Sequence, residues 1–115
     1  MTGRLTAVVL GAALVLAGIG LSLPALATPA ENLKVLPKGM DKKDVKPIMK
    51  KWAKALGVDC DHCHHDDGMA IDTKKKEAAR AMLEMVMAVN EKYMKKLDAE
   101  LTCMTCHQGD VKPKK

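Results

Sequence analysis

The chain has 115 residues, a formal charge of +5 and 48% hydrophobic residues, and Trp52 and Tyr93 are its only aromatic residues. A chain of this length forms one small domain, and with no phenylalanine it has few bulky side chains to fill a core. A bound or covalent stabilising group is therefore expected. Lysine runs such as Lys74-Lys75-Lys76 usually lie on a solvated face, so they give little support for nucleic-acid binding.

The first residues predict export. Arg4 is the only charge before an apolar stretch that continues to Leu23, and Ala25-Leu26-Ala27 has the small residues that suit a signal peptidase. We therefore predict a signal peptide at residues 1–27, a mature chain that begins at Thr28, and a periplasmic location. The alternative is an uncleaved membrane anchor, because roughly 20 apolar residues span a bilayer.

Two prolines and Gly39 interrupt residues 28–40, so we expect an extended N-terminal arm before a domain at residues 41–115. A helix is predicted next, and Gly57 ends it. Asp41 or Asp44 can cap this helix, and Asp44 fits better because Pro47 then lies in the first turn. Apolar residues with helical spacing form its stripe: Val45, Ile48, Met49, Trp52 and Leu56.

A second, longer helix is predicted from Asp72 or Thr73 to about Leu97. Its apolar stripe alternates steps of three and four residues and has Met85 beside it. The stripe consists of Ala79, Met82, Val86, Val89, Tyr93 and Leu97. No segment shows a strand pattern, so the fold class is predicted to be all-α.

Each predicted helix is followed by the same short motif. Cys60-Asp61-His62-Cys63-His64 and Cys103-Met104-Thr105-Cys106-His107 use all four cysteines and match the attachment motif for c-type haem. The two thiols add to the vinyl groups of one porphyrin, and the following histidine ligates its iron. We expect two covalent haems, held by Cys60, Cys63, Cys103 and Cys106, with His64 and His107 as proximal iron ligands.

Two other interpretations of the cysteines are weaker. Two disulfides are chemically possible in an exported chain, but they give no reason for the histidine after each pair. A zinc site commonly has roughly 15 to 20 residues between its cysteine pairs, and the pairs at Cys60 and Cys103 lie much farther apart.

The sixth iron ligands decide the chemistry, because methionine raises the reduction potential relative to histidine and an open position permits ligand binding. Met49, on the first apolar stripe, is the candidate for the first haem. Met82 or Met85 is the candidate for the second, whereas Met87 and Met94 turn away and Met104 cannot reach across its own ring. His65, or less well His62, offers a bis-histidine alternative.

Several segments together resemble the cytochrome subunit of photosynthetic reaction centres. They are NLKVLP at residues 32–37, MKKWAKALGVDC at 49–60, Ala79-Arg80 with Met82 and Asn90, and TCMTCHQG at 102–109. In that family haems come in pairs, and a helix methionine is the sixth ligand at three of the haem motifs. The resemblance implies Met49 and Met82 as sixth ligands here. With one haem pair rather than two, the chain resembles half of the family's subunit.

The sequence thus predicts a small dihaem c-type cytochrome with two main helices, each preceding a haem-attachment loop. The favoured function is to carry single electrons between membrane-bound or periplasmic redox partner proteins, without enzymatic activity. The alternatives are a haem enzyme or a gas- or peroxide-binding protein with one open iron site, and a subunit of a larger cytochrome assembly. Membrane association is expected only if the signal stays uncleaved, and no sequence feature specifies the oligomeric state.

Overall fold

The computed structural model describes residues 23–115; most of the predicted signal peptide lies outside this range. Helix α1 spans Lys42–Leu56, α2 spans Lys74–Lys92 and α3 spans Cys103–His107, with short 3-10 helices η1 at Cys60–His62 and η2 at Met94–Leu97. The described residues contain no strand, only two isolated bridges. The all-α prediction is confirmed.

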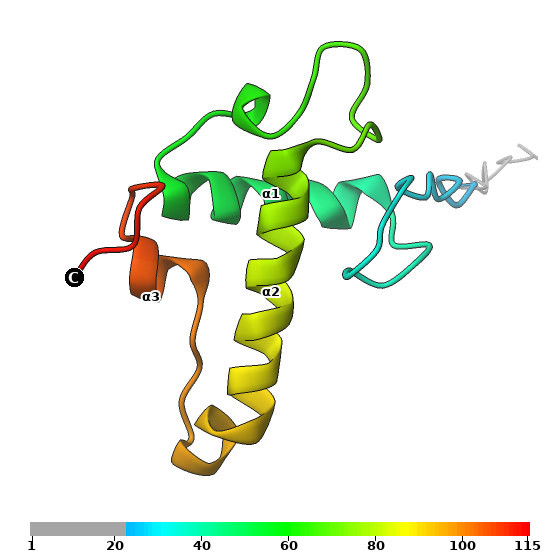
Figure 1. The fold of residues 1–115 in the computed structure, drawn as a ribbon. Helices are drawn as coiled ribbons and strands as arrows, with labels where there is room; N and C mark the ends of the chain where they lie inside the picture. Colours follow the sequence, from blue (N-terminus) through cyan, green and yellow to red (C-terminus); the bar gives the residue numbers. More distant parts are fainter. Residues whose placement is uncertain (1–22) are drawn as a thin grey trace, which may run out of the picture.

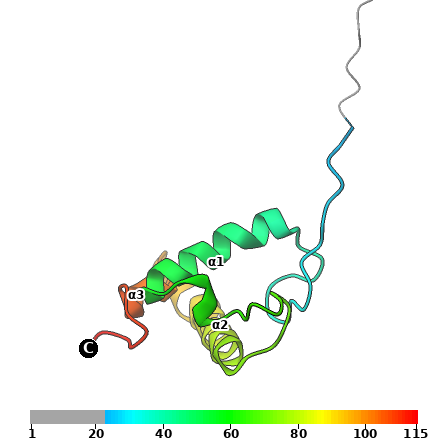
Figure 2. The same cartoon turned by 90° about the horizontal axis from the view of Figure 1, so that it is seen from above.

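Helices α1 and α2 cross, and α2 extends away from α1 (Figure 1). After η2 the chain returns along α2 and brings α3 to the C-terminal end of α1. Figure 2 shows the same placement from above, with the C-terminus of the chain beside α3. The contacts between elements agree with this placement, because α1 contacts both η1 and α3.

Helix α1 begins one turn earlier than predicted. Its N-cap is Asp41, whose carboxylate accepts a hydrogen bond from the Lys43 amide at 2.9 Å and another from the Thr28 amide at 3.1 Å. The prediction of Asp44 as the cap is wrong, because Thr28 adds a distant contact to Asp41 that favours the earlier start. Asp44 lies in the first turn, where a negative charge interacts favourably with the helix dipole, and Pro47 lies inside the helix.

Helix α2 begins after Thr73, as predicted, with the Thr73 side chain accepting from the Lys76 amide. The α-helix ends at Lys92 rather than Leu97, and η2 completes the predicted length. This tighter turn, followed by Asp98 in the left-handed conformation, lets the chain reverse direction toward Asn90.

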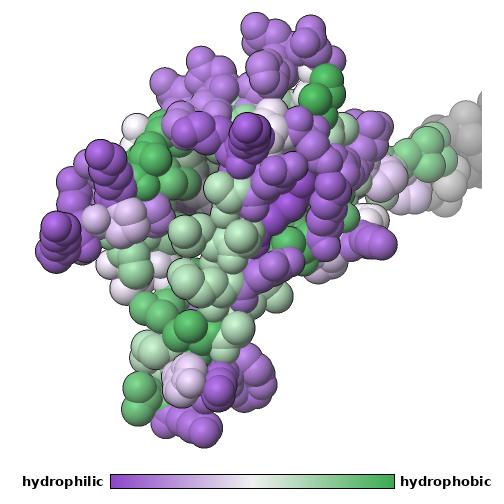
Figure 3. Space-filling view, in the orientation of Figure 1, coloured by the Kyte–Doolittle hydropathy of each residue, from purple (hydrophilic) through white to green (hydrophobic). Residues whose placement is uncertain are grey.

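The core of the described residues is very small. Only Val45 and Ala55 are buried apolar residues, whereas several large apolar side chains are exposed. The predicted stripe on α2 is only partly correct, since Met82, Tyr93 and Leu97 are at least half exposed while Leu83, Val86 and Val89 are half-buried. Figure 3 shows hydrophobic residues on the surface along α2 and toward η2.

Residues 28–40 fold back on themselves. The Ala30 amide donates to the Met40 carbonyl and the Lys42 amide donates to the Thr28 carbonyl, each at 2.9 Å. The loop is then attached to the start of α2, because Asn32 and Lys34 both bind Asp72. This contact joins segments that are 38 or more residues apart.

Candidate haem-attachment sites

The first motif is a 3-10 turn between α1 and α2. The Cys63 and His64 amides both donate to the Cys60 carbonyl, at 3.3 and 3.0 Å, which winds the two cysteines and the histidine around one turn. Cys60 is exposed and Cys63 is half-buried. Burial raises the pKa of the Cys63 thiol, and the nearby ammonium groups of Lys75 and Lys76 oppose this shift.

The start of α2 holds the first motif in place. The Thr73 hydroxyl donates to the Cys63 carbonyl at 3.0 Å and also caps α2 through the Lys76 amide. One side chain therefore fixes both the end of the motif and the beginning of the helix.

His64 is oriented by a backbone carbonyl. Its Nδ1 lies 3.2 Å from the Met69 carbonyl oxygen, and because a carbonyl can only accept, Nδ1 carries the proton there. The unprotonated Nε2 is then available to a metal, which is the usual arrangement of a ligating histidine. Burial lowers the pKa of His64, and the Lys76 charge lowers it further, so the neutral form that ligates iron is favoured.

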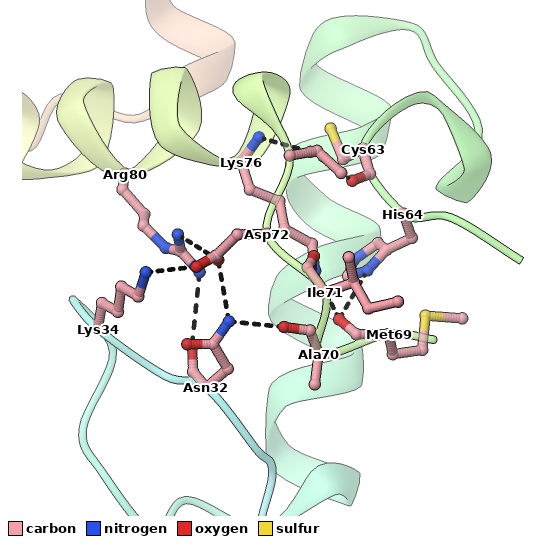
Figure 4. Close-up of polar contacts among 11 residues, drawn as sticks. Asn32, Lys34, Cys63, His64, Met69, Ala70, Ile71, Asp72, Lys76 and Arg80 are labelled. Atoms are coloured by element: carbon pink, nitrogen blue, oxygen red, sulfur yellow. Dashed lines mark hydrogen bonds and ion pairs between the residues drawn. The ribbon is translucent and has the colours of Figure 1, made fainter. Parts of the chain in front are cut away.

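The Met69 carbonyl has a second donor. Lys76 Nζ lies 2.6 Å from this oxygen and 2.6 Å from the Ile71 carbonyl oxygen, as Figure 4 shows. Lys76 is thus half-buried and hydrogen-bonded, unlike the solvated lysine that its place in a lysine run suggested.

The second motif forms helix α3. Thr102 and Thr105 form a reciprocal capping box, in which the Thr102 amide donates to the Thr105 hydroxyl at 3.0 Å. His107 Nδ1 lies 2.9 Å from the Asp110 carbonyl oxygen, so this histidine is oriented in the same way as His64. Burial raises the pKa of the Cys103 thiol.

Two further contacts anchor the second motif. The Gly109 amide donates to the Ala55 carbonyl of α1 at 2.8 Å. Asn90 of α2 binds Leu101 twice, accepting from its amide at 2.7 Å and donating to its carbonyl at 2.8 Å. The second motif is therefore held between both long helices.

The predicted sixth ligands lie on α1, on α2, and in η1 and the loop after it. Met49 is half-buried on α1, while Met82 and Met85 are 50% and 53% exposed on α2. His62 is half-buried and His65 is exposed in the loop after the first motif. Met87 and Met104 are also exposed, and Met94 is half-buried in η2.

The residues around the motifs fit a covalent haem. All four cysteines are unbonded, and each motif has a histidine whose Nδ1 is held by a carbonyl. A cavity of about 340 Å³ beside the first motif is lined by Cys60, His64 and Met69 among others. Within residues 23–115, no three histidine, cysteine or acidic side chains gather as a metal site.

Sequence reasoning missed the residues that support the motifs. Helical spacing identifies Thr73 only as a possible start of the second helix, and the lysine run places Lys76 on a solvated face. Asn90 was noted only through the family resemblance. An asparagine on the half-buried face of α2 was the one available signal, because such a side chain needs hydrogen-bond partners.

Comparison with known proteins gives the family of this chain. The family model described as the photosynthetic reaction centre cytochrome C subunit matches residues 23–115. The chain belongs to this family. The photosynthetic reaction center cytochrome c subunit of Rubrivivax gelatinosus is 32% identical over 101 residues, which cover 68% of this chain and 28% of the relative. The chain thus spans less than a third of the length of that relative.

Membership of this family points to covalent c-type haem as the cofactor. When bound, each haem supplies an iron that takes up and releases one electron. In the part of the chain that the structure describes, no helix is long and apolar enough to cross a membrane.

Proposed function

We propose that this protein is a periplasmic dihaem cytochrome that carries single electrons between redox partner proteins and catalyses no bond chemistry. The observation that supports this most strongly is the repeated arrangement of the two motifs. In both, a Cys-x-x-Cys turn is followed by a histidine whose Nδ1 donates to a backbone carbonyl, at Met69 for His64 and at Asp110 for His107.

The cysteines and histidines have assigned roles in this proposal. Cys60 and Cys63 attach one haem and Cys103 and Cys106 attach the other, while His64 and His107 are the proximal ligands. Because each histidine is oriented by the backbone, little rearrangement is needed at the ligand when the charge on iron changes.

For the sixth ligands we propose Met49 at the first haem and Met82 at the second, with Met85 and His65 as alternatives. Met49 is supported by its position on the half-buried face of α1, the helix that leads into the first motif. Met82 is supported by its position on α2, the helix that leads to the second motif. Methionine ligation makes both haems six-coordinate carriers of comparatively high potential.

Location and partners follow from the same proposal. Haem attachment and the predicted signal at residues 1–27 both suit an exported protein. The partners are membrane-bound or periplasmic redox proteins, and membrane association depends on whether the signal is cleaved.

Counting the haems tests the core of the proposal. A pyridine haemochrome assay with the protein concentration from amino-acid analysis should give two haems per chain. The paired variants Cys60→Ser/Cys63→Ser and Cys103→Ser/Cys106→Ser should each retain one. A wild-type protein with a single haem would contradict the proposal.

Redox titration with spectra across the iron–methionine charge-transfer band tests the sixth ligands. Met49→Ala and Met82→Ala should each remove part of this band and lower the potential of one haem. Met87→Ala is the matched control on α2, since Met87 is as exposed as Met85, and it should change neither. An unaltered band in both test variants would overturn the assignments, and Met85→Ala and His65→Ala would then identify the ligands.

A further inference from the structure

Helix α1 has a continuous cationic face. Its lysines are all exposed, and with 3.6 residues per turn they fall within about half of the helix circumference. The opposite side carries the buried residues Val45 and Ala55. We call this the lysine face; it consists of Lys42, Lys43, Lys46, Lys50, Lys51 and Lys54.

Among residues 23–115, no ion pair neutralises the lysine face. The ion pairs among residues 23–115 involve Lys34, Arg80, Lys95 and Lys114 as the cations. The only acidic residue within α1 is Asp44, in the first turn. The six positive charges are therefore exposed, and the acidic residues Asp41 and Asp44 lie only at the start of α1, beside Lys42 and Lys43.

This arrangement is unfavourable for the isolated helix. Lys46 is four residues from both Lys42 and Lys50, and like charges at that spacing destabilise a helix. In α2, by contrast, Glu77, Glu84 and Glu91 are distributed among the basic residues. A face that retains such repulsion is typical of a surface that meets an external anion.

The lysine face ends beside both haem-attachment motifs. The C-terminal end of α1 contacts η1 and α3, and the Ala55 carbonyl binds the Gly109 amide. The C-terminal tail also lies there (Figures 1 and 2), held by the Lys114 amide on the Cys106 carbonyl at 2.8 Å. Lys50, Lys51 and Lys54 thus lie on the half of α1 nearest the motifs.

We infer that the lysine face docks the acidic face of a redox protein and directs that protein's cofactor toward the C-terminal end of α1. This inference rests on the proposed electron-carrier function. Complementary charge raises the encounter rate and orients the partner, and the effect weakens as salt screens it. An acidic protein fits better than an anionic membrane, because membrane-surface helices insert their apolar side, whereas α1 turns that side inward.

Stopped-flow reduction of the oxidised holoprotein tests the inference, with reduced flavodoxin as the acidic one-electron probe. The second-order rate constant should fall about tenfold or more between low and high salt. Lys46→Glu/Lys50→Glu/Lys54→Glu should lower the low-salt rate constant about tenfold and flatten its salt dependence. At high salt the wild type and the variant should converge.

The matched control is Lys38→Glu/Lys92→Glu/Lys96→Glu, which changes the net charge equally at exposed positions outside α1. It should slow the reaction much less. Equal slowing by both triple variants would overturn the inference, because net charge alone would then explain the effect.

Two measurements distinguish failure of the docking inference from failure of the proposed function. Visible spectra of the variants should match the wild type, and their measured potentials correct the rate constants for any change in driving force. A wild type without two redox-active haems would instead contradict the proposed function. Co-sedimentation with vesicles containing phosphatidylglycerol examines the membrane as the alternative. Loss of vesicle binding in the α1 variant, with an unchanged reduction rate, would overturn docking of a protein.

Discussion

Gly57 and Gly109 are in direct backbone contact where α1 meets the second haem motif. A Cβ atom at Gly57 would lie 2.1 Å from the Gly109 carbonyl oxygen, and Gly57 is also in the left-handed conformation with φ of 65°. Two requirements therefore coincide at one residue: the helix ends there, and the second motif packs against it. The first helix and the second haem site are thus coupled through a residue that belongs to neither motif.

Gly57→Ala should destabilise the holoprotein by roughly 2 kcal/mol or more, because left-handed strain and overpacking each cost about 1 kcal/mol or more. Chemical denaturation followed by circular dichroism measures this. Gly39→Ala is the control, since Gly39 also has a positive φ but has nothing within 4 Å of the added Cβ. Equal losses in both variants would show that the contact with Gly109 contributes nothing.

Asn90→Ala should destabilise the protein by about 1 to 3 kcal/mol, since it removes two hydrogen bonds to Leu101. The second haem should be attached less completely than the first, which the haem content and the mass of the purified protein will show. Asn90→Asp retains the acceptor but loses the donor, so its effect should be intermediate. The control is Glu91→Ala, at the exposed position next to Asn90, which should change the stability by no more than about 0.5 kcal/mol. A larger loss of stability in Glu91→Ala would indicate a general effect on α2.

Asp72 should make the stability of the folded protein depend on pH in the acidic range. The Lys34 ammonium has the largest effect on the Asp72 carboxyl and holds its pKa far below its usual range. Arg80 Nη1 at 2.7 Å and Asn32 Nδ2 at 2.9 Å from Asp72 Oδ1 lower this pKa further. Because the folded pKa is lowered, this contribution is fully present above the unfolded pKa, about 3.9, and is lost progressively as the pH falls from there through the lower folded pKa.

Urea unfolding at pH 7 and at pH 3 measures the Asp72 contribution. Asp72→Asn should lower stability at pH 7 and lower it less at pH 3, so that the difference between the two pH values shrinks. Asp67→Asn, an exposed residue of the same loop, should leave the difference intact. An unchanged difference in Asp72→Asn would refute the prediction.

Lys76→Met should lower the reduction potential of the first haem and leave that of the second unchanged. Without Lys76, the Met69 carbonyl accepts only from His64, so its bond to Nδ1 strengthens and the imidazole becomes a stronger donor to iron. Loss of a nearby positive charge acts in the same direction, because it disfavours the added electron. Redox titration with both haems resolved measures this shift. The control is Lys74→Met, because Lys74 is an exposed neighbour. A raised or unchanged potential of the first haem in Lys76→Met would contradict the prediction.

Haem removal should unfold most of the chain. Only Val45 and Ala55 are buried apolar residues in the described part of the protein, which is too small a core for a domain of this size. The variant with all four cysteines changed to serine should lose most of its helical circular dichroism signal. Native helicity in that variant would show that the helices form without the cofactor.

The elements that could be predicted from sequence are those that depend on neighbouring residues. The end of α1 at Gly57, the start of α2 at Thr73 and the all-α class follow from helical spacing and capping chemistry, which act over a few residues. The incorrect predictions all involve distant contacts. Asp41 caps α1 because Thr28 binds it, and α2 tightens into η2 as the chain turns back toward Asn90.

The residues that support the two motifs also depend on distant contacts. Asn32 and Lys34 reach Asp72, Lys76 reaches the carbonyl that orients His64, and these groups come together only when loop 28–40 and the start of α2 are folded. Apolar periodicity carries no information about such polar pairs, because it reports which side of a helix is covered and not what covers it.

The sequence by itself predicted the covalent chemistry, since two cysteines followed by a histidine form the haem-attachment motif whatever the fold. The tertiary structure decided how the two motifs are placed and supported: both lie at the C-terminal end of α1, one through η1 and the other through the contact of Gly109 with Ala55 and Gly57. The physical reason is the distance along the chain over which the interactions act. Attachment depends on residues within one turn of the chain, whereas the relation between the motifs depends on backbone contacts between segments more than 50 residues apart.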